Sequence, residues 1–331
     1  MLISNNKKVS IIISAFNAEK HIAATLDSLL QQTYPNLEII VVNDGSTDNT
    51  LSILESYKAK GVQFFSQENK GQDAALNLGY KYSKGEYIKF MDSDDLINPE
   101  MIELQLNAIS NSSDYVAYGE WARFYHNNPS NANFKSLDYW TNTEPLEFIL
   151  ARPEGVMLQC GIMLIPRHLI DKVGGWDERL ILFNDTEFFN RIILASKGVK
   201  FVKGVRLYYR SGMASSISAQ NGRKYFESTL LAIDLIADQL LKKEDSIRVR
   251  TFIANLYQDR YFQLYPLYPD LCIDYKNRLL EFPLSTLKPQ GGKFFNFLIL
   301  FLGWKITKVV QRYFYSLGYK PNNVQRFILC F

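Results

Sequence analysis

Four apolar runs alternate with segments of helical periodicity over the first part of the chain. Val9–Ser14 is a continuous run rich in β-branched residues, which is typical of a strand buried on both faces of a sheet, and Leu37–Val42 is the next predicted buried strand. The other two runs are Val62–Ser66 and Tyr87–Met91. Between them apolar residues recur at helical spacing, first at Ile22, Leu26, Leu29 and Leu30. Because strands that alternate with helices pair in parallel through right-handed crossovers, the pattern predicts an α/β fold whose mostly parallel central sheet is flanked by helices.

The pattern changes after residue 222. Long helical stretches follow, so we expect an α/β domain over residues 1–222 and a helical C-terminal region over residues 223–331. The longest apolar stretch, Phe294–Trp304, is shorter than the about 20 residues that cross a bilayer. We therefore predict no transmembrane helix. Basic residues follow the stretch, which favours peripheral contact with a membrane surface; they are Lys305, Lys308 and Arg312.

Composition narrows the class of protein. Of the 331 residues, 47% are hydrophobic and 21% are charged, which is typical of a folded globular protein. The net charge of +3 is too small to indicate nucleic acid, and we expect no nucleic-acid partner. The three cysteines lack metal or redox spacing, and the polar segment Met1–Lys8 is unlike a secretory signal. We expect a cytoplasmic protein, peripheral at the inner face of the plasma membrane.

Polar and aromatic side chains follow the predicted strands at the points where the strands end. Ser14 and Phe16 close the first strand, Asp44 follows the second, and Asp92 and Asp94 follow the fourth. Ligands of parallel sheets bind outside the carboxyl ends of the strands. Two carboxylates flanking one serine can converge on a hard cation, Mg²⁺ or Mn²⁺, and such an ion neutralises a diphosphate leaving group.

Each of these residues also has a structural interpretation. The acidic run from Asp92 can be a solvated turn before the helix at Pro99, and Phe16 can be a core residue. Asp-Gly-Ser at Asp44 is a common turn, although the Asp44 carboxylate can also accept a hydrogen bond from a ring N–H such as that of uracil. Their joint placement at successive strand ends favours a nucleotide site. Gly-x-Gly-x-x-Gly and Walker motifs are absent, which disfavours dinucleotide and P-loop sites.

Four motifs, in this order, resemble the family 2 glycosyltransferases. They are VSIIISAFN at 9–17, IIVVNDGSTD at 39–48, NKG at 69–71 and GEYIKFMDSDD at 85–95, and the resemblance covers about residues 7–212. It implies a GT-A fold and inverting transfer from a nucleotide-sugar, with a UDP-sugar as the expected donor. By resemblance, Ser14, Phe16, Asp44 and Asn69 belong to the donor site. Asp92 and Asp94 then form the Asp-x-Asp element, with Asp94 on the metal and Asp92 on ribose or metal, and Arg210 approaches the diphosphate.

The resemblance also indicates the catalytic base. The family often places an acidic pair at the start of a later helix, and the matching segment here is Phe183–Arg191. Asp185 is the expected base, although an aspartate at a helix start also fits the helix dipole. Asn184 replaces the first acid of the pair. We expect Glu187 and Arg191, four residues apart, to pair on the helix surface.

A second departure is Leu76, where many members have an arginine near the donor; Lys70 or Lys89 are candidate replacements. The expected function is therefore inverting transfer of one sugar, by direct displacement, to a glycan or lipid-linked acceptor. The alternative is an inactive nucleotide-sugar-binding module, which the Asn184 and Leu76 departures favour. An aspartyl phosphatase is disfavoured, because in that class of enzyme the Asp-x-Asp motif follows the first strand, whereas in this chain it follows the fourth.

Overall fold

A computed structural model describes residues 7–112, 114–152, 158–212, 222–289 and 291–317. The chain forms two compact units. One consists of Met1–Ala151 and Leu158–Ser216, and the other of Arg152–Met157 and Ile217–Phe331. The C-terminal part of the predicted helical region, residues 318–331, lies outside the described residues.

The first unit is built on a five-stranded sheet of order β3-β2-β1-β4-β7. Its first four strands in the chain are β1 (Val9–Ala15), β2 (Leu37–Asp44), β3 (Gln63–Gln67) and β4 (Tyr87–Asp92), and they pair in parallel. The short strand β7 (Ile165–Pro166) adds to β4 in the antiparallel direction. The predicted mostly parallel sheet is therefore confirmed, and β1 at its centre is almost wholly buried.

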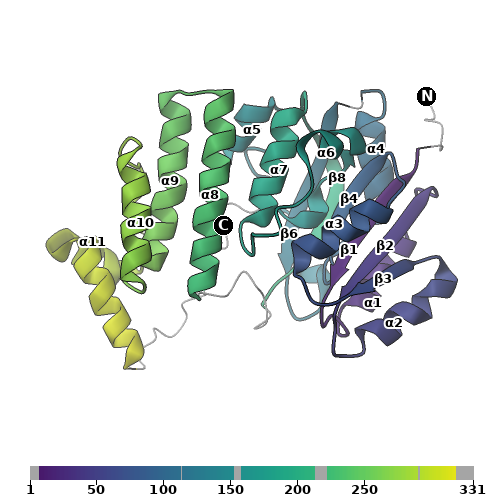
Figure 1. Cartoon of the computed structure of the whole chain (residues 1–331), viewed down its shortest axis with the longest axis horizontal. Helices are drawn as coiled ribbons and strands as arrows, with labels where there is room; N and C mark the ends of the chain where they lie inside the picture. The colour runs from purple at the N-terminus through teal and green to yellow at the C-terminus, as the bar shows by residue number, and fades with distance from the viewer. Residues whose placement is uncertain (1–6, 113, 153–157, 213–221, 290, 318–331) are drawn as a thin grey trace. The chain divides into compact units, whose positions relative to one another are not determined.

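Helices connect these strands because their apolar stripes cover the sheet. In α1 (Ile22–Leu30) the residues at helical spacing, Leu26 and Leu29, are buried. The helix α3 (Gln72–Tyr82) packs against β1 and β2 (Figure 1). The remaining helices of this unit are α2 (Thr50–Tyr57), α4 (Met101–Ile109), α5 (Pro145–Ala151), α6 (Arg167–Val173) and α7 (Asn184–Ala195), with short 3-10 turns at Lys58–Lys60, Pro129–Asn131 and Cys160–Ile162.

A second, three-stranded sheet completes the first unit. Its order is β5-β8-β6, with β5 (Leu96–Ile97), β8 (Gly198–Arg210) and β6 (Tyr115–Phe124). β5 pairs antiparallel with β8, so that Leu96 lies opposite Tyr208. Because β5 follows directly on the acidic loop after β4, this pairing brings the end of β8 to that loop.

The second unit is helical. It contains α8 (Arg223–Lys243), α9 (Ile247–Leu264), α10 (Pro269–Leu280) and α11 (Lys293–Ser316). One carboxylate joins the first three: Asp234 of α8 accepts hydrogen bonds from Tyr257 Oη at 2.6 Å and from Arg278 Nε at 2.9 Å.

The helix α11 is the one helix in the described part of the chain that is long and apolar enough to cross a membrane by composition. The helix is longer than the predicted apolar stretch Phe294–Trp304, because it continues past Trp304 to Ser316. The backbone of Gly303, with φ 69° and ψ 162°, breaks the helix, and Figure 1 shows its two halves at an angle.

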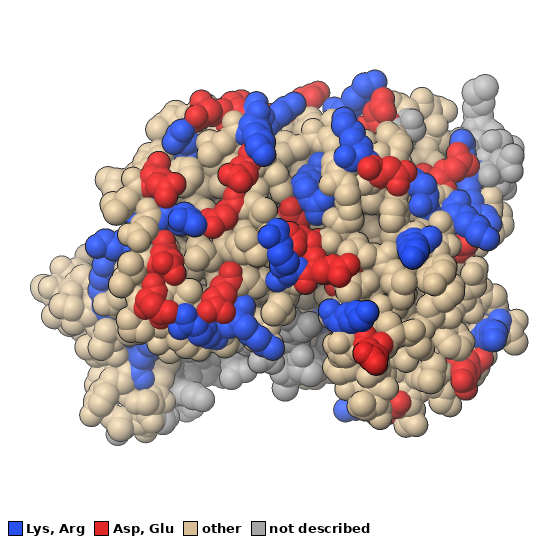
Figure 2. Space-filling view, in the orientation of Figure 1, with Lys and Arg blue, Asp and Glu red and all other residues tan. Residues whose placement is uncertain are grey.

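Charges of both signs are mixed on the surface. On the face drawn in Figure 2, the described Lys and Arg side chains alternate with Asp and Glu side chains. This face therefore presents no broad field of a single sign among its described residues, as expected from the small net charge of +3.

Candidate active site

The strand ends predicted to form a site lie level with one another. In the sheet register, Ser14 of β1 stands between Val42 of β2 and Asp92 of β4. On the next strand pair Asp44 lies opposite Gln67. The side chains that close β1, β2 and β4 are therefore neighbours at one edge of the sheet, where parallel sheets bind ligands.

The loop after β1 carries an exposed aromatic ring. Phe16 is 50% exposed, so it is not the core residue that the sequence also allowed. The next residue, Asn17, has a left-handed backbone with φ 49°. Its amide donates to Ser46 Oγ at 3.0 Å, and its side chain accepts from the Thr47 amide at 2.8 Å. These bonds hold the loop after β1 to the loop after β2 and leave the Phe16 ring open to a ligand.

The buried carboxylate of Asp44 holds the 67–71 segment at the end of β2. It accepts hydrogen bonds from Gln67 Nε2 at 2.7 Å and from the amides of Lys70 and Gly71, both at 2.9 Å. A carboxylate offers about four acceptor positions, so one remains for a base N–H.

Asn69 is brought to the same place by a glycine. Gly45 has φ 71°, and a Cβ on it would stand 2.7 Å from the Asn69 amide nitrogen. A side chain at Gly45 would therefore push the 69–71 loop away from the end of β2.

Asp92 lies in a cluster of negative charge. Its Oδ1 accepts a hydrogen bond from Gln72 Nε2 at 2.8 Å. Burial, together with the charges of Asp94 and Asp185, raises the pKa of Asp92 to about 7. Burial also raises the pKa of Asp94, which the positive charge of Arg210 opposes. The negative charge of Asp185 on α7 therefore acts on the Asp92 carboxyl.

This cluster fits a divalent cation. Hard oxygen ligands suit Mg²⁺ and Mn²⁺, and a cation would offset both the burial and the neighbouring negative charges that raise the pKa of Asp92. Among the described residues, no group of three or more His, Cys, Asp or Glu side chains is placed to hold a metal ion. Asp92 and Asp94 would supply two carboxylates, and Mg²⁺ in proteins usually takes phosphate oxygens and water as its other ligands.

Asp95 differs from Asp92 and Asp94 in its contacts. It is completely buried, its Oδ1 accepts from the Arg210 amide at 2.8 Å, and burial raises its pKa well above the usual range. Thr25 Oγ1 donates to the carbonyls of Ser93 at 3.0 Å and Asp95 at 2.9 Å. Asp95 and Thr25 therefore shape the acidic loop, and Asp95 does not face the ligand edge as a free carboxylate.

Arg210 lies against the acidic loop, as its place at the end of β8 requires. Its Nε donates to the Asp94 carbonyl at 2.7 Å, and its guanidinium stands 4.6 Å from the centre of the Phe124 ring. A second bond runs from the guanidinium to Asn127 Oδ1. Arg210 thus places a cation beside the backbone of Asp94.

Asp185 lies in the first turn of α7, which begins at Asn184. The residue before it, Phe183, is buried and left-handed with φ 67°, a conformation that costs free energy for a bulky side chain. Asn184 Nδ2 donates to Asp73 Oδ1 on α3 at 2.6 Å. Asp73 is not among the predicted site residues, because an aspartate in the first turn of a helix ordinarily complements the helix dipole.

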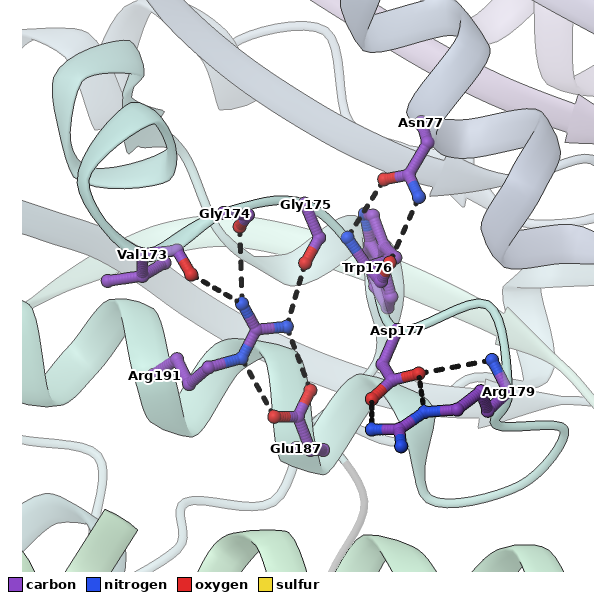
Figure 3. A network of polar contacts seen from close by, with 9 residues as sticks. All are labelled: Asn77, Val173, Gly174, Gly175, Trp176, Asp177, Arg179, Glu187 and Arg191. Carbon is purple, nitrogen blue, oxygen red and sulfur yellow. Dashed lines mark hydrogen bonds and ion pairs between the residues drawn. The ribbon is translucent and has the colours of Figure 1, made fainter.

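Glu187 and Arg191 pair, but the predicted surface location is wrong. Glu187 is 3% exposed, and its carboxylate accepts from Arg191 at 2.7 and 2.9 Å. The same guanidinium donates to three successive carbonyls (Figure 3), those of Val173, Gly174 and Gly175. The pair therefore clamps the loop before residue 176 onto α7.

Asn77 holds the other side of that loop. Its side chain accepts from the Trp176 amide at 2.8 Å and donates to the Trp176 carbonyl at 2.9 Å (Figure 3). The Trp176 ring stacks on Phe188, with ring centres 4.1 Å apart. The loop and the start of α7 are thus fixed from two helices, α3 and α7.

Lys89 does not replace the cation that is missing at Leu76. Leu76 is completely buried, and so is Lys89, whose Nζ donates to the carbonyls of Gly161 at 2.8 Å and Met163 at 3.1 Å. Burial lowers the pKa of Lys89 to about 7. Lys89 therefore supports the 161–163 segment from inside the fold, while Arg210 is the cation beside the acidic loop.

Comparison with known proteins agrees with this architecture. Residues 10–174 match Glycosyl transferase family 2. An uncharacterized glycosyltransferase of Rickettsia typhi is 36% identical over 190 residues, which are 57% of this chain and 59% of the relative. The glycosyltransferase GlyG of Streptococcus pneumoniae is 27% identical over 290 residues, covering 81% of this chain and 95% of GlyG.

Solved structures show the same fold. The crystal structure of S. aureus TarS 1-349 in complex with UDP-GlcNAc matches with a TM-score of 0.68 at 19% identity, covering 95% of this chain and 93% of that chain. The chain belongs to glycosyl transferase family 2 and has the GT-A fold. It spans 59%, 42% and 38% of the length of three Rickettsia relatives.

Proposed function

We propose that the chain transfers one sugar from a UDP-sugar to a hydroxyl of a glycan or lipid-linked acceptor, with inversion. The observation that carries the proposal is the register of β1, β2 and β4, which puts Asp92 level with the ends of β1 and β2, together with the charge of Asp185 on α7 that acts on Asp92. The exposed ring of Phe16 offers a stacking face for a base, and the remaining acceptor position of Asp44 suits a uracil N–H. UDP-GlcNAc in the TarS complex supports a uridine donor.

The reaction that fits these residues is a direct displacement. The acceptor oxygen bonds to the anomeric carbon while the Asp185 carboxylate takes the hydroxyl proton. The bond from that carbon to the diphosphate oxygen breaks, and UDP leaves with the electron pair. Attack opposite the leaving group inverts the anomeric centre.

The leaving diphosphate needs positive charge near it. Asp92 and Asp94 would hold Mg²⁺ or Mn²⁺, which supplies a Lewis acid for the departing phosphate oxygens when bound. Arg210 adds a cation of the protein itself, 2.7 Å from the Asp94 carbonyl. Both donor-side charges therefore lie at the end of β4, and the base stands across from them on α7.

Catalysis accounts for the site better than donor binding alone. Asn184, which favoured an inactive module, is bonded to the buried carboxyl of Asp73, and Leu76 lies in the core. The first turn of α7 therefore remains tied to the site by an acid on α3. A binding module would have no need of Asp185 beside the donor carboxylates.

The test combines a donor panel with one variant. We expect a UDP-sugar, from a panel of UDP-, GDP- and dTDP-sugars, to raise the melting temperature in the presence of Mn²⁺ and to support transfer. Asp185→Asn should lower kcat by about 10²- to 10⁴-fold, the range for loss of a general base, with UDP affinity unchanged. Retained transfer in this variant, or an equal loss of UDP binding, would overturn the assignment.

The location at a membrane is a separate proposal. Much of α11 is exposed although apolar, with Phe294 at 69%, Leu300 at 79% and Phe301 at 72%. The helix carries lysines and an arginine and no acidic residue. An apolar face with flanking cations suits an anionic bilayer surface. We propose peripheral attachment at the cytoplasmic face of the plasma membrane, where a lipid-linked acceptor would be carried.

A further inference from the structure

Two consecutive residues at the start of α3 reach opposite sides of the candidate active site. Gln72 Nε2 donates to Asp92 Oδ1 at 2.8 Å, on the donor side. Asp73 Oδ1 accepts from Asn184 Nδ2 at 2.6 Å, on the side of α7. The first turn of α3 is thus bonded both to the Asp-x-Asp element and to the residue that precedes Asp185.

Asp73 is an unusual residue for a helix start. It is 3% exposed, and its Oδ2 is buried without a hydrogen-bond partner in the described part of the chain. Burial raises the pKa of Asp73 to about 8, against the Asn184 hydrogen bond, and the negative charges nearby add to the rise; they belong to Asp185, Asp177 and Glu187. Burial of a carboxyl oxygen without a partner costs free energy.

A carboxyl that weakens the fold is expected where it serves the site. Its one described side-chain partner, Asn184, opens the helix that carries Asp185. The bond joins α3 to α7 over 111 positions of sequence. It therefore fixes the first turn of α7 against the same helix turn that holds Asp92.

We propose that Asp73 is a positioning residue for the transfer reaction, which acts through Asn184 to set the place of Asp185 relative to Asp92. The proposal rests on the proposed role of Asp185 as base. A displacement of about 1 Å of a catalytic group can cost about 10²-fold in rate, so the bond matters for kcat more than for donor binding.

The test separates the hydrogen bond from the charge. Asp73→Ala removes the acceptor and should lower kcat by about 10- to 100-fold, with the affinity for UDP and Mn²⁺ within about threefold of wild type. Asp73→Asn keeps an oxygen that can accept from Asn184 and should retain most of kcat. Asp73→Leu fills the site without an acceptor and should lose kcat as Asp73→Ala does, whereas loss of packing alone would leave this variant active.

An exchange of the two side chains gives a second test. Asn184→Asp alone sets two carboxyls against each other and should lower kcat. The double variant Asp73→Asn with Asn184→Asp restores one amide and one carboxyl and should recover most of the loss, as a coupled pair does in a double-mutant cycle. This pair is nearly isosteric, so it carries the test even where Asp73→Ala fails to fold.

Asp171→Ala is the matched control. Asp171 also bonds α3 from another helix, since Tyr80 Oη donates to its Oδ1 at 2.6 Å, but at the far end of α3. Its loss should leave kcat unchanged. Wild-type kcat in Asp73→Ala, or a double variant no better than Asn184→Asp, would overturn the positioning role. Retained transfer by Asp185→Asn would instead refute the base itself, and both proposals with it.

Discussion

The amide nitrogen of Arg210 donates to the buried Asp95 carboxylate at 2.8 Å, while the Arg210 side chain reaches the carbonyl of Asp94. The backbone bond fixes the end of β8 at the acidic loop whatever side chain stands at position 210. The acidic loop is therefore held by two bonds from Arg210, and only the one from the guanidinium to the Asp94 carbonyl depends on the side chain.

Arg210→Ala should weaken UDP binding in the presence of Mn²⁺ by about 10- to 100-fold, because a hydrogen bond to a charged group contributes about 1.5–3 kcal/mol. Calorimetric titration with UDP measures the effect. Arg206→Ala is the control, since Arg206 lies on the same strand and pairs with Glu120 at the surface. Equal losses in the two variants would show a general charge effect and no specific contact.

Asp94→Ala should abolish the dependence of UDP affinity on Mn²⁺. In the wild-type protein we expect affinity to rise as Mn²⁺ is added, because Asp94 supplies a metal ligand. Titrations of UDP with and without Mn²⁺ give the two affinities. Glu103→Ala, which removes a carboxylate bonded to Thr33 away from the edge, should behave as wild type. An undiminished Mn²⁺ effect in Asp94→Ala would contradict the metal role.

Lys89→Met should destabilise the protein by about 1–3 kcal/mol, because the carbonyls of Gly161 and Met163 lose a buried donor. The pKa of Lys89 is lowered from 10.5 to about 7, so between these values the unfolded chain binds more protons than the folded one. Wild-type stability then rises with pH through this interval, and the variant lacks this rise. Urea unfolding near pH 6 and pH 9 should show the larger deficit at the higher pH; a deficit that shrinks would be inconsistent with a lowered pKa.

Asp73→Asn should become more stable relative to wild type as pH rises from about 4 to about 8. The pKa of Asp73 is raised from 3.8 to about 8, so the folded wild type binds more protons than the unfolded chain in this interval. Wild-type stability therefore falls with rising pH, and the variant lacks this contribution. Melting temperatures across the interval test it, and parallel curves for the two proteins would refute the raised pKa.

Replacement of Phe297, Leu300 and Phe301 by glutamate should abolish flotation with vesicles of phosphatidylcholine containing about a third phosphatidylglycerol. These residues are exposed on α11, at 56%, 79% and 72%. Ile273→Glu with Leu280→Glu alters exposed apolar residues of α10 and should leave flotation unchanged. Wild-type protein that stays with the soluble fraction would rule out the attachment.

The parts of the fold that local pattern encodes were predicted correctly. β1, β2 and β4 are mostly buried, and the ends of β2 and β4 are marked by Asp44 and Asp92, whereas β3 is a partly exposed strand at one end of the sheet order. The strand β8 was not predicted, because its polar and apolar residues show no clear strand pattern and its partners β6 and β5 are distant in sequence. Asp73 was not predicted for the same reason, since only its contact with Asn184 of α7 distinguishes it from an ordinary aspartate in the first turn of a helix.

The antiparallel pairing of Leu96 with Tyr208 has a consequence for how the chain can vary. Asp94 lies two residues before Leu96, and Arg210 lies two residues after Tyr208. Insertion or deletion of one residue in either arm would shift the cation along the acidic loop by about 3.3 Å and turn its side chain to the other face of the strand. Length changes are therefore expected to be excluded from these two short arms.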